Sequence, residues 1–313
     1  MKKLNFVVSL ITNDNDFQME QAIAAEEAAR RLGVNIQILY AEGDTILQSQ
    51  QLLHIIQSHS DSHPDGIIME PAGGTALPQV ARAAVSSGIA WVVINREADY
   101  LSGLRKQYRV PAFAVSSDHE EIGRIQGRQF GALLPSGGTV LYIQGATESS
   151  AAKQRTAGMY ETKPANVEVK ILRGSWTEAS AHKAVSSWLR LSTSYQSHMN
   201  VIAAQNDAMA VGAKKAFQEV LDNAARERWL SLPFMGCDGV PKTGQAWVRT
   251  GLLTATVIAP PLTGTAMEIL VKAIQTGTMP PERTLIPPRS LPPVENLAPR
   301  HTEKAGSSFS LRT

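Results

Sequence analysis

The sequence is poor in cysteine and carries almost no net charge. Cys237 is the only cysteine among the 313 residues, which excludes an intrachain disulfide. It follows Gly236 in an apolar segment, which predicts a buried, unreactive thiol. Lys and Arg number 30 against 28 Asp and Glu, a net charge of +2, so no strong field attracts nucleic acid or an anionic membrane. No apolar run reaches about 18 residues, so no membrane-spanning helix is predicted.

Sequence motifs of common catalytic sites are also missing. The chain contains no G-x-S-x-G elbow, no P-loop and no G-x-G-x-x-G fingerprint. Gly73-Gly74-Thr75 and Gly137-Gly138-Thr139 are typical of turns. His54, His59 and His63 span a helix end and a polar loop, which indicates a solvated surface rather than a metal site. These absences argue against an enzyme, and neither a cofactor nor a bound metal is predicted.

The first residues contain a feature of export signals. Met1-Lys2-Lys3 precedes an apolar segment, but Asn5 and Ser9 interrupt it and no small-residue cleavage site follows. We interpret this segment as the first strand. The chain then either stays in the cytoplasm or is written without its export signal.

Short apolar segments alternate with helical ones along the chain, which predicts an α/β fold. The apolar segments are continuous rather than alternating with polar residues, as in parallel strands covered on both faces. The predicted strands are residues 4–11, 34–40, 66–69, 90–94, 139–143, 167–172, 201–204, 232–236 and 254–258. The predicted helices include a first one closed by Gly33, and residues 44–57, 77–87, 118–133, 150–160, 178–191, 245–249 and 262–276.

The stretch VIAAQNDAMAVGAKKAF, residues 201–217, combines a buried strand, three polar residues and a helix. Ligands of open α/β sheets bind at the carboxyl ends of strands, where these polar residues lie. The alternative is that Asn206 or Asp207 only caps the helix. Polar residues after other strands favour binding. They are Asn13, Asp14, Asp16, Glu70, Asn95, Arg96, Arg155 and Asp238.

The two halves of the chain repeat this arrangement. Residues 66–96 and residues 201–238 each contain a strand, a polar tip, a helix and a second strand that ends in a polar pair. Two similar units with polar tips predict two lobes that face each other across a cleft, a favoured position for ligands.

Carboxylate, guanidinium and amide groups next to the aromatic rings of Phe17 and Trp176 suit a sugar. Each sugar hydroxyl both donates and accepts hydrogen bonds, and flat apolar rings pack against its C–H surfaces. Two alternatives remain open at this point. The polar tips can be helix caps and surface charges, and Asp207 with Asp238 can perform acid–base chemistry, although an Asp paired with an Arg is the simpler interpretation.

Four motifs resemble the type I periplasmic sugar-binding proteins, especially the ribose-binding group. They are VVSLITNDNDF, SAAKQRTAGM, AQNDAMAVGAKKAF and FMGCDG, and the resemblance runs from about residue 4 to about residue 297. It implies two Rossmann-like lobes with parallel sheets, joined by three crossovers. The same fold forms the effector domain of LacI-type repressors, but no helix-turn-helix segment precedes the first strand, which argues against an intact repressor.

On this basis we expect residues 1–116 plus 260–288 to form the N-terminal lobe and residues 117–259 plus 289–299 to form the C-terminal lobe. Six prolines lie between residues 280 and 293, which predicts extended crossing segments. The polar residues 300–313 are expected to be disordered.

The resemblance also implies ligand contacts, at Asn13, Phe17, Asn95, Arg96, Arg155, Trp176, Asn206 and Asp238. Three positions depart from the family pattern. Asn95 stands where an Asp is usual, residues 255–260 lack the usual Gln, and residues 99–115 form a longer segment than in the ribose binders. The ligand is therefore expected to be sugar-like, with ribose itself in doubt.

The resulting functional hypothesis is a non-catalytic solute-binding protein that captures a small sugar for an ABC importer. Its implied partners are the sugar and the transporter permease. Neither nucleic-acid binding nor membrane insertion is expected, and the protein is expected to be a monomer in the periplasm. The alternative is a cytoplasmic sugar sensor of the same fold without a DNA-binding domain.

Overall fold

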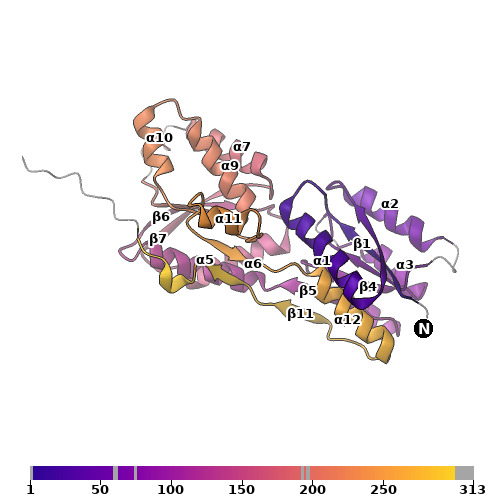
Figure 1. The fold of residues 1–313 in the computed structure, drawn as a ribbon. Helices are drawn as coiled ribbons and strands as arrows, with labels where there is room; N and C mark the ends of the chain where they lie inside the picture. Colours follow the sequence, from indigo (N-terminus) through magenta and orange to yellow (C-terminus); the bar gives the residue numbers. More distant parts are fainter. Residues whose placement is uncertain (1–2, 59–62, 74–75, 192–193, 195–197, 300–313) are drawn as a thin grey trace, which may run out of the picture.

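The computed structural model describes residues 3–58, 63–73, 76–191, 194 and 198–299. Helices and strands alternate through this part of the chain and form two lobes, as predicted (Figure 1). The predicted disorder of residues 300–313 concerns residues outside the described part. Among the described helices, none combines the length and the apolar character that crossing a membrane requires.

The N-terminal lobe is built on a parallel sheet of six strands. In spatial order the strands are β11, β5, β4, β3, β1 and β2. Their bounds are β1 Asn5–Leu10, β2 Asn35–Tyr40, β3 Gly66–Met69, β4 Ala90–Ile94, β5 Ala112–Ser117 and β11 Arg283–Ile286. β3, β4 and β5 are buried along their whole length, as expected for a sheet covered on both faces.

Helices cover both faces of this sheet. On one face lie α1 Asp16–Leu32 and α12 Thr263–Thr276, which pack against each other although they come from opposite ends of the chain (Figure 1). On the other face lie α2 Thr45–Ile56, α3 Pro78–Ser86 and α4 Leu101–Gln107. Gly33 ends α1 with φ 68°, the left-handed conformation that favours glycine, which confirms the predicted helix end.

The C-terminal lobe has a second parallel sheet, in the order β7, β6, β8 and β9. These strands are β6 Gly138–Gln144, β7 Val167–Arg173, β8 Val201–Ala204 and β9 Phe234–Met235. Single parallel bridges continue the sheet toward β10 Thr256–Ile258, which pairs antiparallel with β12 Arg289–Leu291.

The helices of this lobe also lie on two faces. α5 His119–Leu133 and α6 Ser150–Thr162 cover one face, whereas α7 Glu178–Leu189, α9 Asp207–Gln218 and α10 Asn223–Leu230 cover the other. Shorter helical segments are α11 Gly244–Arg249 and η2 Val294–Asn296.

α5 and α6 approach each other closely because both carry glycine at the contact. A Cβ atom on Gly158 would lie 2.0 Å from the carbonyl oxygen of Glu120, and one on Gly123 would lie 2.1 Å from the carbonyl oxygen of Arg155. Gly158, three residues after Arg155 in the stretch SAAKQRTAGM, therefore allows the backbone contact that places Arg155.

The chain passes between the lobes after β5, after β10 and after β11. The sequence interpretation missed α4, β5 and α10, and it described β11 and β12 only as extended segments. β5 reads AFAVSS, and its small and polar residues lack the branched apolar run that marks the other strands. The predicted lobe boundaries at residues 116, 259 and 288 stay a prediction.

The glycine contact between α5 and α6 predicts opposite effects for two Gly→Ala substitutions. Gly158→Ala should lower the free energy of unfolding by about 1–3 kcal/mol, because the new methyl group overlaps the Glu120 carbonyl. Gly103→Ala in α4, where the new Cβ atom would have no neighbour within 4 Å beyond the adjacent helix backbone, should leave stability unchanged or raise it by up to about 1 kcal/mol. Urea unfolding measures both, and equal effects would contradict this packing argument.

Candidate functional site

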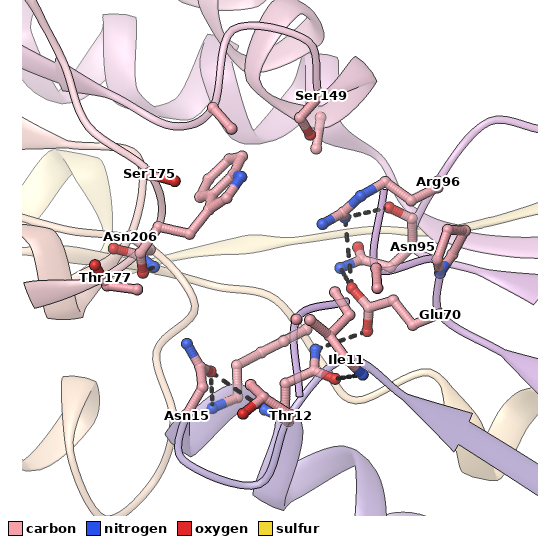
Figure 2. Close-up of a pocket in the computed structure, with 18 of the residues that line it drawn as sticks. Ile11, Thr12, Asn15, Glu70, Asn95, Arg96, Ser149, Ser175, Thr177 and Asn206 are labelled. Carbon is pink, nitrogen blue, oxygen red and sulfur yellow. Dashed lines mark hydrogen bonds and ion pairs between the residues drawn. The ribbon is translucent and has the colours of Figure 1, made fainter. Parts of the chain in front are cut away.

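A cavity of about 450 Å³ lies between the lobes, at the carboxyl ends of strands from both sheets. Figure 2 shows Glu70, Asn95 and Arg96 on one side of it and Ser175, Thr177 and Asn206 on the opposite side. We call this space the interlobe cavity. Its wall consists of residues that follow β1, β2, β3 and β4 in the N-terminal lobe, and β6, β7, β8 and β9 in the C-terminal lobe, together with residues of α1 and α6.

The structure brings most of the predicted contact residues to this cavity. Its wall includes Phe17, Asn95, Arg96, Arg155, Trp176, Asn206 and Asp238. Asn13 is the exception, because it lies exposed on the loop after β1 and does not line the cavity. Asn15 of the same loop lines the cavity instead. Ligand contact by these residues stays a prediction.

The wall of the N-terminal lobe is organised by the buried carboxylate of Glu70. Its Oε1 accepts a hydrogen bond from Asn95 Nδ2 at 2.8 Å and lies 3.4 Å from an Arg96 guanidinium nitrogen. Its Oε2 accepts from Gln18 Nε2 at 2.8 Å. The family resemblance places an acid after β4, where this chain has Asn95 instead. The buried acid of this wall is Glu70, which follows β3.

The wall of the C-terminal lobe is organised by the guanidinium of Arg155, which is only 3% exposed. One terminal nitrogen donates to the carbonyl oxygen of Gln205 and lies 3.6 Å from a carboxylate oxygen of Asp238. The Trp176 ring centroid is 5.4 Å from the guanidinium carbon, a cation–π distance. A charge buried this deeply needs such partners, because its own hydration has been lost.

His119 connects the two walls. Arg155 Nε donates to His119 Nδ1 over 3.4 Å, so the imidazole proton lies on Nε2, which is 3.3 Å from the carbonyl oxygen of Asn95. Burial holds the pKa of His119 well below its ordinary value, and the charges of Arg155 and Arg96 lower it further. A neutral imidazole thus joins Arg155 in one lobe to the backbone just after β4 in the other.

Two carboxylates lie near Arg155, but only that of Asp238 lines the cavity. Asp207 accepts from Thr256 Oγ1 at 2.7 Å and from the Gly239 amide at 2.8 Å. These bonds hold β10 and the loop after β9 against the start of α9. Burial, reinforced by Asp238, raises the pKa of Asp207 well above its ordinary value. Both Asp207 oxygens are engaged within the fold, which favours a structural role over the acid–base alternative.

Asn206 both caps α9 and lines the cavity. Its Oδ1 accepts from the Met209 amide at 2.9 Å, which agrees with the capping alternative, and its Nδ2 donates to the Trp176 carbonyl oxygen at 2.8 Å. An amide nitrogen has two hydrogens, so one N–H is left for the cavity.

Four residues of the wall adopt left-handed backbone conformations. They are Glu42 with φ 51°, Asn95 with φ 62°, Trp176 with φ 65° and Asp238 with φ 100°. Residues other than glycine rarely adopt positive φ, and such strain concentrates at ligand sites. Asn95 and Asp238 are of the types that tolerate it best.

The two aromatic residues of the wall are held by packing. Phe17 is 8% exposed and belongs to an apolar cluster with Ile122, Ile125 and Cys237, in which α1 of one lobe meets α5 of the other. The Trp176 ring covers Gly145, where a Cβ atom would lie 2.3 Å from it. Cys237 is fully buried, and burial raises the pKa of its thiol, as the sequence predicted for an unreactive cysteine.

The sequence interpretation left several wall residues out of the predicted site. Glu70 was noted as a polar tip but not as a contact, and Asn15 was passed over although its Oδ1 caps α1. Gln18 and Ser149 reach the cavity from the starts of α1 and α6. Neither directly follows an apolar strand, which was the pattern used to predict contact residues. In the described part of the chain, no three His, Cys, Asp or Glu side chains gather as metal ligands, and His59 lies outside that part.

Residues 6–278 match the family model described as periplasmic binding protein domain. Among curated proteins, the chain is 25% identical to the D-allose-binding periplasmic protein of Escherichia coli K12, over 88% of this chain and 86% of the relative. It is 23% identical to the ribose import binding protein of Bacillus subtilis 168, over 83% of this chain and 77% of that one.

Two solved structures show the same fold. One is a periplasmic solute-binding protein of an ABC transporter from Actinobacillus succinogenes 130z with bound D-allose. It has a TM-score of 0.78, 20% identity, and coverage of 92% of this chain and 97% of that one. The other is a solute-binding protein from Bacillus halodurans C-125 with bound myo-inositol, with a TM-score of 0.76, 22% identity, and coverage of 94% and 96%. These likenesses confirm the predicted α/β architecture.

The burial of Asp238 predicts a specific dependence of stability on pH. Burial raises the pKa of Asp238 to about 6, against the opposing effect of Arg155. Because this value lies above the pKa of an unfolded aspartate, ionisation at rising pH disfavours the folded state. Compared with Asp238→Asn, the natural chain should lose about 2 kcal/mol of unfolding free energy between about pH 4 and about pH 7.

Chemical denaturation across this pH range tests the prediction in the ligand-free protein. Glu148→Gln is the matched control, because Glu148 lines the same cavity but is exposed. Parallel curves for the natural chain and Asp238→Asn would show that Asp238 titrates as an ordinary aspartate.

Proposed function

Because the chain belongs to the periplasmic binding protein domain family, we propose that it captures a small sugar or sugar-like solute in the interlobe cavity for an ABC importer. Family membership confirms the resemblance to type I periplasmic binding proteins that the sequence motifs indicate. In this proposal the protein works in the periplasm as a monomer, catalyses no reaction, and hands its ligand to a transporter permease.

The observation that carries the proposal is the chemistry of the two cavity walls. One lobe presents Glu70, Asn95 and Arg96, and the other presents Arg155 and Asp238. A ring that bears several hydroxyl groups meets acceptors and donors on both sides, and each hydrogen bond to a charged group is worth about 1.5–3 kcal/mol. Trp176 adds an apolar face for the C–H surface of a ring.

The names of similar proteins suggest a first panel of ligands. D-allose, D-ribose and myo-inositol are rings that carry several hydroxyl groups, and each occurs in the name of a relative or of a similar structure. Mass spectrometry of the purified protein would identify a retained ligand, and calorimetry with this panel would rank affinities. The proposal would be overturned if the protein bound no sugar of this panel and retained no sugar-like compound. Chemical conversion of a bound sugar would identify an enzyme.

Arg155→Met should weaken binding of the best ligand by roughly tenfold to a hundredfold, the equivalent of one charged hydrogen bond. The side chain is buried in the wall. Its Nε and one terminal nitrogen donate within the fold, so the other terminal nitrogen is the donor that we expect to contact a ligand hydroxyl. Lys153→Met on the same helix is the control, because Lys153 is exposed and outside the wall. Calorimetry on folded variants gives both values. An affinity of Arg155→Met within about threefold of the natural chain would show that Arg155 does not hold the ligand.

The two walls also predict closure of the lobes on binding. A ligand that bridges Arg96 and Arg155 favours the state in which both contacts form at once, and only such differential contacts shift the equilibrium. Small-angle scattering should therefore show a smaller radius of gyration in the saturated protein. A ligand that raises the melting temperature with no change in radius would leave binding intact and refute closure.

A further inference from the structure

The two lobes contact each other beside the cavity through side chains that do not line it. We propose that Glu97, paired with Gln154 across the lobe boundary, holds the lobes together and thereby sets the affinity of the interlobe cavity from outside its wall. This role deepens the proposed function, and its effect on affinity rests on that function.

The pair joins the lobes at the chain neighbours of the two cavity arginines. Glu97 follows Arg96 after β4 of the N-terminal lobe, and Gln154 precedes Arg155 on α6 of the C-terminal lobe. Gln154 Nε2 donates to Glu97 Oε1 at 2.5 Å. Both arginines line the cavity, whereas Glu97 and Gln154 lie outside its wall. This interlobe bond is therefore linked through the chain to the ligand wall of each lobe.

Glu97 has two further partners at this boundary. Its Oε1 lies 3.4 Å from an Arg283 guanidinium nitrogen on β11, which belongs to the sheet of its own lobe. Its backbone amide donates to Ser150 Oγ at 3.5 Å, at the start of α6. Arg283 thus holds the carboxylate from within the N-terminal lobe, in position for the donor from the other lobe.

A bond between the lobes acts on the equilibrium between open and closed states. Opening separates Glu97 from Gln154, so their bond favours the closed state by its own free energy, with or without a ligand. Glu97 is 42% exposed, and exposed polar contacts of this kind are individually weak. The apparent affinity scales with the fraction of protein in the binding-competent state. A weak bond outside the wall therefore changes the affinity for every ligand by the same modest factor.

Interlobe distances in the ligand-free protein test this role. Spin labels on Gln50→Cys in α2 and Leu221→Cys before α10 are suitable, because both positions are exposed and Cys237 is buried. α2 and α10 lie in different lobes (Figure 1). Pulsed electron–electron resonance on this labelled background then gives the populations of short and long interlobe distances.

Gln154→Glu should shift these populations toward long distances, because it places a second carboxylate against that of Glu97. The ratio of long to short distances should rise about threefold or more, and less at high salt. The double variant Gln154→Glu with Glu97→Gln exchanges the acid and the amide. It again sets one donor opposite one acceptor, so the short distances should return.

The matched control combines Gln154→Glu with Glu268→Gln. Glu268 is also an exposed acid, but its partner Arg31 belongs to the same lobe, so its substitution should leave the distances long. Two results would overturn the role of Glu97. One is an unchanged distance distribution in Gln154→Glu, and the other is an equal return of short distances in both double variants.

Calorimetry with the ligand panel tests the effect on affinity. Glu97→Met removes the acceptor, so it should weaken binding of each ligand that binds by the same factor, about twofold to fivefold. Glu268→Gln should leave each affinity unchanged. A loss confined to one ligand would show that Glu97 contacts the ligand itself, which contradicts a role outside the wall.

The two measurements separate this role from the proposed function. Failure of the natural chain to bind any panel sugar or to retain a sugar-like compound overturns the proposed function, and the distances still decide whether Glu97 holds the lobes together. Ordinary binding by the natural chain with unchanged distances in Gln154→Glu leaves the proposed function standing and overturns the role of Glu97.

Discussion

A buried guanidinium is the constraint on which the site depends. Arg155 cannot keep its charge inside the protein without compensation, and each of its partners comes from a different element. Asp238 follows β9, Gln205 follows β8, and His119 begins α5. The cation therefore draws the carboxyl ends of two neighbouring strands and a helix start to one point. The ligand wall of the C-terminal lobe is this set of partners.

Packing elsewhere in the fold stabilises the buried charge of Arg155 and the strained backbone around it. Glycines at the α5–α6 contact let the helix that carries Arg155 approach its neighbour, and Asp207 holds the loop that carries Asp238 through Gly239 and Thr256. The strained backbone at Asp238 is stabilised by this surrounding packing. In the N-terminal lobe a buried anion, Glu70, plays the corresponding part. The two walls thus form around charges of opposite sign.

Much of this could be predicted from the sequence, and the failures have physical causes. Continuous apolar runs followed by polar tips identify strands and cavity walls, so Asn206 and Arg96 were found from local pattern. The pattern fails for β5, where Ala112–Ser117 is buried by its neighbours rather than by its own hydrophobicity. It fails also for Glu70, since its bonds to Gln18 and Asn95 join residues 52 and 25 positions away in the chain. Asn15 caps α1 and lines the cavity, whereas Asn13 two residues earlier is exposed, and the local sequence does not distinguish the two asparagines.

The strength of the apolar cluster around Phe17 depends on temperature. Phe17 comes from the N-terminal lobe, whereas Ile122, Ile125 and Val240 come from the C-terminal one, so this apolar contact lies between the lobes. Hydrophobic association weakens on cooling. Cooling therefore weakens the apolar contact between the lobes, and if the lobes move as proposed, the angle that they adopt without a ligand would depend on temperature.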